Sequence, residues 1–119
     1  MNDLLTFIAQ SPSPLHAVDN LCRELLSSGY TRLAEGERWS LAPGGKYFVT
    51  RNGSALLAFR LPEGPFRGFM VSASHSDAPT FRVKENAELM GPEGYVRLNT
   101  ERYGGMLCAP WLDRPLTVA

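Results

Sequence analysis

The sequence lacks an excess of charge of either sign. Lysine plus arginine and aspartate plus glutamate number 12 each, so the formal net charge is zero. A protein that binds nucleic acid through phosphate contacts needs a basic surface, and this balance provides none. No apolar run approaches the roughly 20 residues needed to cross a bilayer. We therefore expect no nucleic-acid partner and no membrane partner.

Cysteine is scarce: the chain has only Cys22 and Cys108, and no CxxC pair. A zinc finger or a thioredoxin-like site is therefore not indicated. We expect two buried thiols in a reducing compartment. The first residues include Asp3, an acid where a signal peptide needs positive charge. Together with the lack of a membrane-spanning run, this favours a cytoplasmic protein.

Two common enzyme motifs are missing. No GxSxG is present, which disfavours a serine hydrolase of the α/β type, and no GxxxxGK[ST] is present, which disfavours a P-loop nucleotidase. The glycine pair Gly104-Gly105 is too little for a phosphate cradle. We interpret it as a tight backbone turn.

The hydrophobic pattern predicts an α/β fold. Apolar spacing predicts two helices, residues 3–10 and 14–28, the second with Ser13 as its N-cap and Gly29 at its end. Asn52-Gly53 predicts a type I′ hairpin. The predicted strands cover residues 39–41, 46–51, 54–61, 68–74, 80–84 and 95–100. We expect the helices to pack on a mixed sheet built from the hairpin and the strand that precedes His75, and the apolar strand 54–61 to be buried on both faces.

His75-Ser76-Asp77 is the sharpest chemical feature, directly after the predicted strand 68–74. Side chains at i and i+2 of an extended segment point the same way. Imidazole is a common zinc ligand, and a nearby carboxylate can fix its tautomer. Open α/β sheets also bind ligands beyond the carboxyl ends of their strands. On these three residues alone, we favour an ordinary surface histidine and aspartate, with a metal site as the alternative.

His16 is the other histidine, near the start of the second predicted helix. We interpret it as a partly exposed helix residue, with a catalytic role as the alternative. Two histidines with few supporting acids cannot build a closed structural zinc site.

Three segments in order resemble the M18 metallo-aminopeptidases, the aspartyl aminopeptidase-like family. Residues 11–18 read Ser-Pro-Ser-Pro-Leu-His-Ala-Val, and residues 74–79 read Ser-His-Ser-Asp-Ala-Pro, followed by Phe-Arg-Val-Lys. Tyr-Gly-Gly at residues 103–105 precedes Trp-Leu-Asp-Arg-Pro-Leu at residues 111–116. Their order and spacing span nearly the whole chain. Departures from the family are mild: Ser76 replaces threonine, Ala78 replaces serine and Pro115 stands where many members have aspartate.

The resemblance implies a zinc-dependent aminopeptidase that removes N-terminal residues from peptides, acidic ones in eukaryotic members. The family has two zinc ions per complete site, with cobalt or manganese as alternative metals. By position, His75 would be a metal ligand and Asp77 the catalytic-site carboxylate that orients it. The family's bridging aspartate comes from a later segment, so we do not assign that role to Asp113, which we expect to pair with Arg114 or another neighbour.

The same resemblance divides the chain. Residues 1–86 would be the N-terminal part of the metallopeptidase catalytic domain, and residues 87–119 the beginning of an inserted dimerisation domain. Family members form homo-oligomers, tetrahedral dodecamers in the full-length proteins. Their remaining ligands and general-base glutamate lie beyond the position of Ala119, so we expect an N-terminal fragment that is inactive by itself. The alternative is a truncated, non-catalytic chain that acts as an assembly module.

Overall fold

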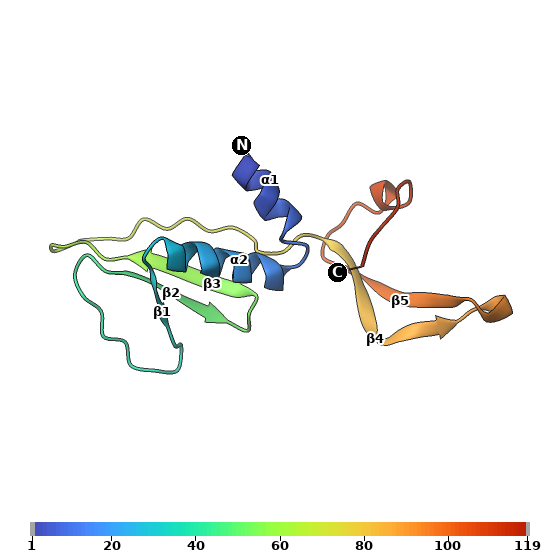
Figure 1. The fold of residues 1–119 in the computed structure, drawn as a ribbon, viewed down its shortest axis with the longest axis horizontal. Helices are drawn as coiled ribbons and strands as arrows, with labels where there is room; N and C mark the ends of the chain where they lie inside the picture. Colours follow the sequence, from blue (N-terminus) through green and yellow to red (C-terminus); the bar gives the residue numbers. More distant parts are fainter. Residues whose placement is uncertain (1, 119) are drawn as a thin grey trace. The chain divides into compact units, whose positions relative to one another are not determined.

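The structure, a computed structural model, describes residues 2–118. The chain divides between Asp77 and Ala78 into two compact units, which we describe separately (Figure 1). Strand β4, Thr80–Met90, lies in the second unit and runs through residue 86. The domain boundary inferred from the family resemblance, after residue 86, stays a prediction.

Two helices open the first unit, close to the predicted bounds: α1, Asn2–Ala9, and α2, Pro14–Ser27. Helix α2 begins as predicted, because the Ser13 side chain accepts a hydrogen bond from the His16 amide and proline occupies the first helical position. Among residues 2–118 no helix is both long enough and apolar enough to span a membrane.

The C-terminus of α2 closes in a Schellman arrangement. The Tyr30 amide donates to the Leu25 carbonyl at 2.9 Å, and the Gly29 amide donates to the Leu26 carbonyl at 3.1 Å. Gly29 has φ +79°, a left-handed conformation that glycine adopts without a Cβ penalty. The chain therefore leaves the helix at the predicted residue and turns directly into the sheet.

Three strands form the mixed sheet of the first unit. In the order β1 (Thr31–Leu33), β2 (Lys46–Arg51) and β3 (Ala55–Arg60), β1 is parallel to β2 and β2 is antiparallel to β3. Asn52 and Gly53 have φ values of 51° and 66° and join β2 to β3 as a type I′ turn requires. The predicted hairpin is confirmed. The sheet is mixed, as predicted, but its third strand is β1 and not the predicted strand 68–74.

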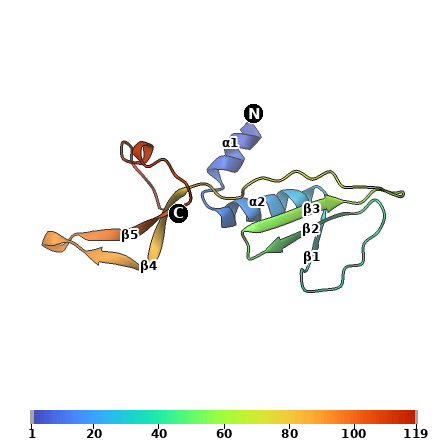
Figure 2. The same cartoon turned by 180° about the vertical axis from the view of Figure 1, so that it is seen from behind.

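The core of this unit lies between α2 and the sheet. Val18, Cys22 and Phe48 form its buried cluster, and Leu25 and Leu56 pack against it. Figures 1 and 2 show α2 lying along the three strands. The apolar stripe of α2 therefore meets the sheet that the hairpin builds.

Three strand predictions are wrong. Residues 39–41 and 68–74 form no strand. Trp39 instead donates from Nε1 to the Ala34 carbonyl at 2.8 Å and stacks on Phe59. Residues 68–74 pair with no strand among residues 2–118, so their apolar pattern alone does not make a ladder. Strand β3 is not buried on both faces, because its side chains are exposed or half-buried, with Leu57 57% exposed.

The second unit is a hairpin with a C-terminal turn. Strand β4 pairs antiparallel with β5, Val96–Tyr103, through a short helical turn, η1, at Pro92–Gly94. The pairing register shifts between Val83 and Glu88. A second short helix, η2, at Ala109–Trp111, packs the Trp111 ring edge-on against Phe81, with ring centroids 5.6 Å apart. Both predicted strands are present, and β4 extends six residues beyond the predicted end at residue 84.

Replacing Phe48 by alanine tests the core. Phe48 is fully buried between α2 and the sheet, so Phe48→Ala should lower the free energy of unfolding by about 3 kcal/mol. Leu57→Ala is the matched control, because that side chain is largely exposed and its loss should change the value by less than about 0.5 kcal/mol. Urea unfolding followed by circular dichroism measures both. Equal losses from the two variants would contradict this core.

Candidate metal-ligating site

His75 and Asp77 lie together in the first unit. His75 Nδ1 is 3.0 Å from Asp77 Oδ1, within hydrogen-bond distance. The His75 side chain is 91% exposed, whereas the Asp77 side chain is 29% exposed. Both residues belong to a stretch without helix or strand, which bends at Ser76 between them. The structure therefore brings the two predicted site residues together, at the end of an unpaired segment and not of a strand.

The direction of this hydrogen bond decides what the imidazole can do. An ionised carboxylate only accepts hydrogen bonds, so beside ionised Asp77 the proton of a neutral His75 ring lies on Nδ1. The Nε2 lone pair is then available to a metal ion. Imidazole nitrogen is a preferred zinc donor. The donor atom of His75 is thus of a kind that zinc binds, and the residue fits the role of one protein ligand.

This pair is only part of a metal site. Within residues 2–118, no group of three or more histidine, cysteine, aspartate or glutamate side chains could hold a metal ion. Zinc sites in proteins use three or four protein ligands. The described residues therefore present a ligand and its orienting carboxylate without a closed coordination sphere.

The hairpin beside His75 and Asp77 has its own tethers. Ser76 Oγ donates to the Ser54 carbonyl at 2.6 Å, directly after the β2–β3 turn. Arg51, at the end of β2, forms an ion pair with Glu35. The hydrogen bond from Arg51 holds the pKa of the Glu35 carboxyl below its ordinary value. Sequence reasoning missed the Ser76 contact, because nothing in the order of residues places the turn next to position 76.

The structure gives His16 a local role. It is exposed on α2, and its Nδ1 lies 2.7 Å from the Ser13 hydroxyl of the N-cap. The interpretation of His16 as an exposed helix residue is confirmed. Its ring contacts the N-cap hydroxyl.

Two further residue predictions concern the second unit. Asp113 pairs with Arg114, with Oδ1 3.3 Å from Nε, as predicted. Gly104 has φ +74°, and a Cβ there would lie 3.6 Å from Pro79, in ordinary contact. The positive φ supports the predicted turn at Gly104-Gly105.

The two cysteines are free thiols. Cys22 is buried in the core, and burial raises the pKa of its thiol above the ordinary value. Cys108 is only half-buried, so the prediction of two buried thiols is wrong for it. It directly precedes the short helix η2, where less of the chain covers it than at Cys22.

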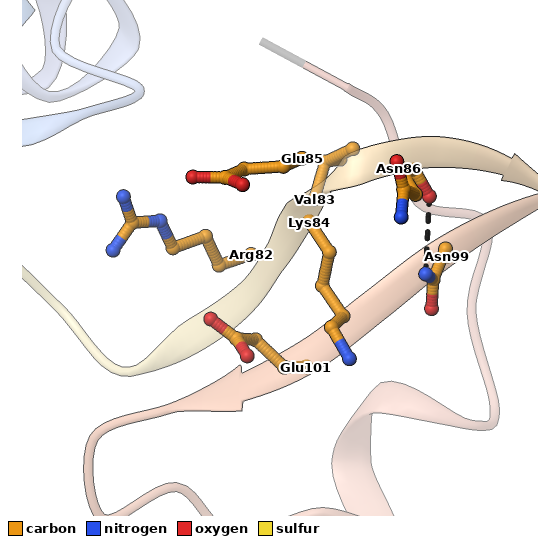
Figure 3. Close-up of a pocket in the computed structure, with 7 residues that line it drawn as sticks. All are labelled: Arg82, Val83, Lys84, Glu85, Asn86, Asn99 and Glu101. Carbon is orange, nitrogen blue, oxygen red and sulfur yellow. Dashed lines mark hydrogen bonds between the residues drawn. The ribbon is translucent and has the colours of Figure 1, made fainter.

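A polar pocket of about 460 Å³ lies in the second unit where the β4–β5 register shifts. Asn99 donates to the Asn86 carbonyl at 3.0 Å across the strands, and Arg82, Glu85 and Glu101 project to one side of the hairpin (Figure 3). Its lining holds no histidine or cysteine, so the chemistry suits polar groups better than zinc. Sequence reasoning missed it, although the polar run Lys-Glu-Asn at residues 84–86 interrupts the strand alternation.

Comparison with known proteins identifies clear relatives. The profile of the aminopeptidase I zinc metalloprotease (M18) family matches residues 7–119. A "Probable M18 family aminopeptidase 2" of Clostridium acetobutylicum is 46% identical over 98% of this chain and 27% of its own length. Another, from Pseudomonas aeruginosa, is 45% identical over the same shares. The chain thus spans about a quarter of the curated relatives it matches.

Solved structures agree with the sequence matches. Ape4 in a cryo-EM complex with Nbr1 superposes with TM-score 0.88 at 40% identity, over 94% of this chain and 22% of that one. Chaetomium thermophilum mApe1 gives TM-score 0.83 at 38% identity, over 92% and 26%. An mApe1 dodecamer of S. cerevisiae gives 0.80 at 31%, over 95% and 27%. These likenesses support an α/β fold that corresponds to one part of a longer catalytic domain.

Thiol reactivity tests the placement of the two cysteines. Cys108 should react with a thiol reagent in the folded chain at least about ten times faster than Cys22, because Cys22 is buried and its raised pKa reduces the thiolate fraction. Labelling that is quenched at successive times, followed by peptide mass mapping, measures each rate. Labelling in urea provides the control in which the two rates converge. Faster labelling of Cys22 in the folded chain would contradict this placement.

Proposed function

The chain belongs to the M18 family of zinc metallo-aminopeptidases, and we propose that it forms the N-terminal part of an enzyme that removes N-terminal residues from peptides. The observation that carries the proposal is the family match over residues 7–119, together with an exposed imidazole oriented by a carboxylate at the His75–Asp77 pair. The proposed preference for acidic N-terminal residues rests on the resemblance to aspartyl aminopeptidases.

His75 and Asp77 have separate tasks in the proposed mechanism. His75 offers Nε2 as a metal ligand from an exposed position, and Asp77 keeps the ring proton on Nδ1 and fixes the ring's orientation. When bound, zinc supplies a Lewis acid that polarises the scissile carbonyl and lowers the pKa of water. We propose two zinc ions per complete site. One histidine does not select among metals, so cobalt or manganese could replace zinc.

The remaining ligands and the general base are proposed to come from residues outside this chain. Two observations support this: residues 2–118 contain no group of three metal-binding side chains, and the chain spans 27% of its curated relatives. We propose that the 119 residues alone are inactive. We also propose a homo-oligomer, because a solved relative is a dodecamer, and a cytoplasmic location, which the two free thiols favour.

A second candidate function is a non-catalytic assembly module. It is favoured by the exposed apolar side chains of Phe69, Met70 and Val71, which would suit a contact with another chain. The coding sequence after Ala119 discriminates between the two. Continuation into a Glu-Glu pair and a late histidine favours the enzyme, whereas a stop codon favours the module.

Zinc affinity of the 119-residue chain tests whether the site is partial. With His75 as its single oriented ligand, the chain should bind zinc weakly, with no saturation at stoichiometric, micromolar metal. Equilibrium dialysis against zinc, with His75→Ala as the reference, measures this. Tight binding of one zinc per chain would show that the proposed division of the site is wrong.

The role of His75 is testable in a chain extended past Ala119 to the length of its relatives. His75→Ala should lower kcat/KM for an acidic aminoacyl anilide by more than about 100-fold, and Asp77→Asn by about 10- to 100-fold. His16→Ala is the matched control, since that exposed histidine contacts the N-cap, and it should stay within about two-fold of wild type. Similar losses from both histidines would count against His75 as the ligand.

A further inference from the structure

We propose that Ser76 is a positioning residue for the candidate site. Its hydroxyl holds the segment 75–77 against the β2–β3 hairpin and so fixes the side to which His75 and Asp77 face. The proposal rests on the proposed function only in taking His75 as a metal ligand. The contact itself is independent of that role.

The Ser76 hydrogen bond joins parts of the chain that are distant in sequence. Ser76 Oγ and the Ser54 carbonyl oxygen are 2.6 Å apart, within the range for an O–H···O bond, and 22 residues separate them. The bond is partly buried, whereas the neighbouring His75 side chain is 91% exposed. Water therefore competes less for the Ser76 bond than for the imidazole beside it.

The acceptor in this bond is held in place. The Ser54 amide donates to the Arg51 carbonyl at 3.3 Å, and the turn between them has positive φ at both central residues. Arg51 is paired in register with Ala55, at the end of the β2–β3 ladder. A carbonyl fixed by a hairpin is a better acceptor than one on a free loop, because its conformational entropy is already lost when the strands pair.

The segment leading to Ser76 has few other constraints. Among residues 2–118, the backbone of residues 64–76 makes no hydrogen bond to another backbone group. The last such bond before it joins the Gly44 amide to the Pro62 carbonyl. A stretch without ladder bonds opens easily, so a side-chain tether near its end has a large effect on its orientation.

The tether lies at a bend between the two candidate site residues. The chain bends at Ser76, so the tethered residue is also the one whose backbone joins His75 to Asp77. Ser76 Oγ binds the hairpin, and the side chains of His75 and Asp77, on either side of Ser76 in the sequence, form their 3.0 Å contact. Releasing Ser76 would let the backbone rotate and separate the imidazole from the carboxylate.

The hydroxyl is the group that matters. Threonine would keep an Oγ able to donate to the Ser54 carbonyl, whereas alanine would remove it. Ser74→Ala removes a neighbouring exposed hydroxyl and leaves the tether intact. Ser76→Ala thus removes the hydrogen bond, Ser76→Thr keeps it, and Ser74→Ala is the matched control.

The test uses the 119-residue chain with ¹⁵N-labelled histidine. At about pH 8.5, above the ordinary histidine pKa of about 6.5, NMR reports which ring nitrogen of neutral His75 carries the proton. Wild type should show mainly the Nδ1–H tautomer. Ser76→Ala should lower the ratio of Nδ1–H to Nε2–H about five-fold, while Ser76→Thr and Ser74→Ala should retain it. His16 provides an internal reference whose signals should not move, and its retained shifts show that the variant is folded.

Two results would overturn the proposal: an unchanged tautomer ratio in Ser76→Ala, or equal losses in Ser76→Ala and Ser76→Thr. The outcome is separable from that of the proposed function. If the tautomer ratio changes as expected but the lengthened chain lacks aminopeptidase activity, the positioning role of Ser76 is supported and the proposed enzymatic function is wrong. If the tautomer ratio is unchanged but His75→Ala abolishes activity, the proposed enzymatic function is supported and the positioning role of Ser76 is wrong.

Discussion

The β2–β3 turn carries the geometry on which the candidate site depends. Its two central residues, Asn52 and Gly53, both have positive φ, so the strands fold back in one register. On one side of the turn, β2 carries Phe48 into the core beneath α2. On the other side, the turn exposes the Ser54 carbonyl that binds Ser76. A single backbone conformation thus links the hydrophobic core to the segment that bears His75.

Burial in this chain is limited, and the exposed apolar residues follow a pattern. The buried hydrophobic residues among residues 2–118 are Ala17, Val18, Cys22, Tyr47, Phe48 and Met106. Phe69, Met70 and Val71 are exposed along the unpaired segment, although their sequence resembles a buried strand. A strand forms only where a neighbour satisfies its backbone groups. The surface of the first unit is therefore suited to pack against further protein.

The chemistry is divided in the same way as the packing. His75 and Asp77 supply a ligand and its orienting carboxylate, and the described residues supply no third donor. The curated relatives are nearly four times as long as the region that matches. In the proposed function this chain is part of a larger catalytic unit. That proposal is consistent with the family membership, the open ligand position and the exposed apolar segment.

The sequence by itself determined the local features: the caps and bounds of α2, the Asn52-Gly53 turn, the Asp113–Arg114 pair and the i, i+2 approach of His75 to Asp77. Each depends on groups a few residues apart, whose conformational preferences act without a distant partner. The tertiary structure decided that residues 68–74 have no strand neighbour, that β3 is half exposed, and that Ser76 reaches Ser54. These outcomes depend on which distant segments meet, and side-chain periodicity carries no information about such partners.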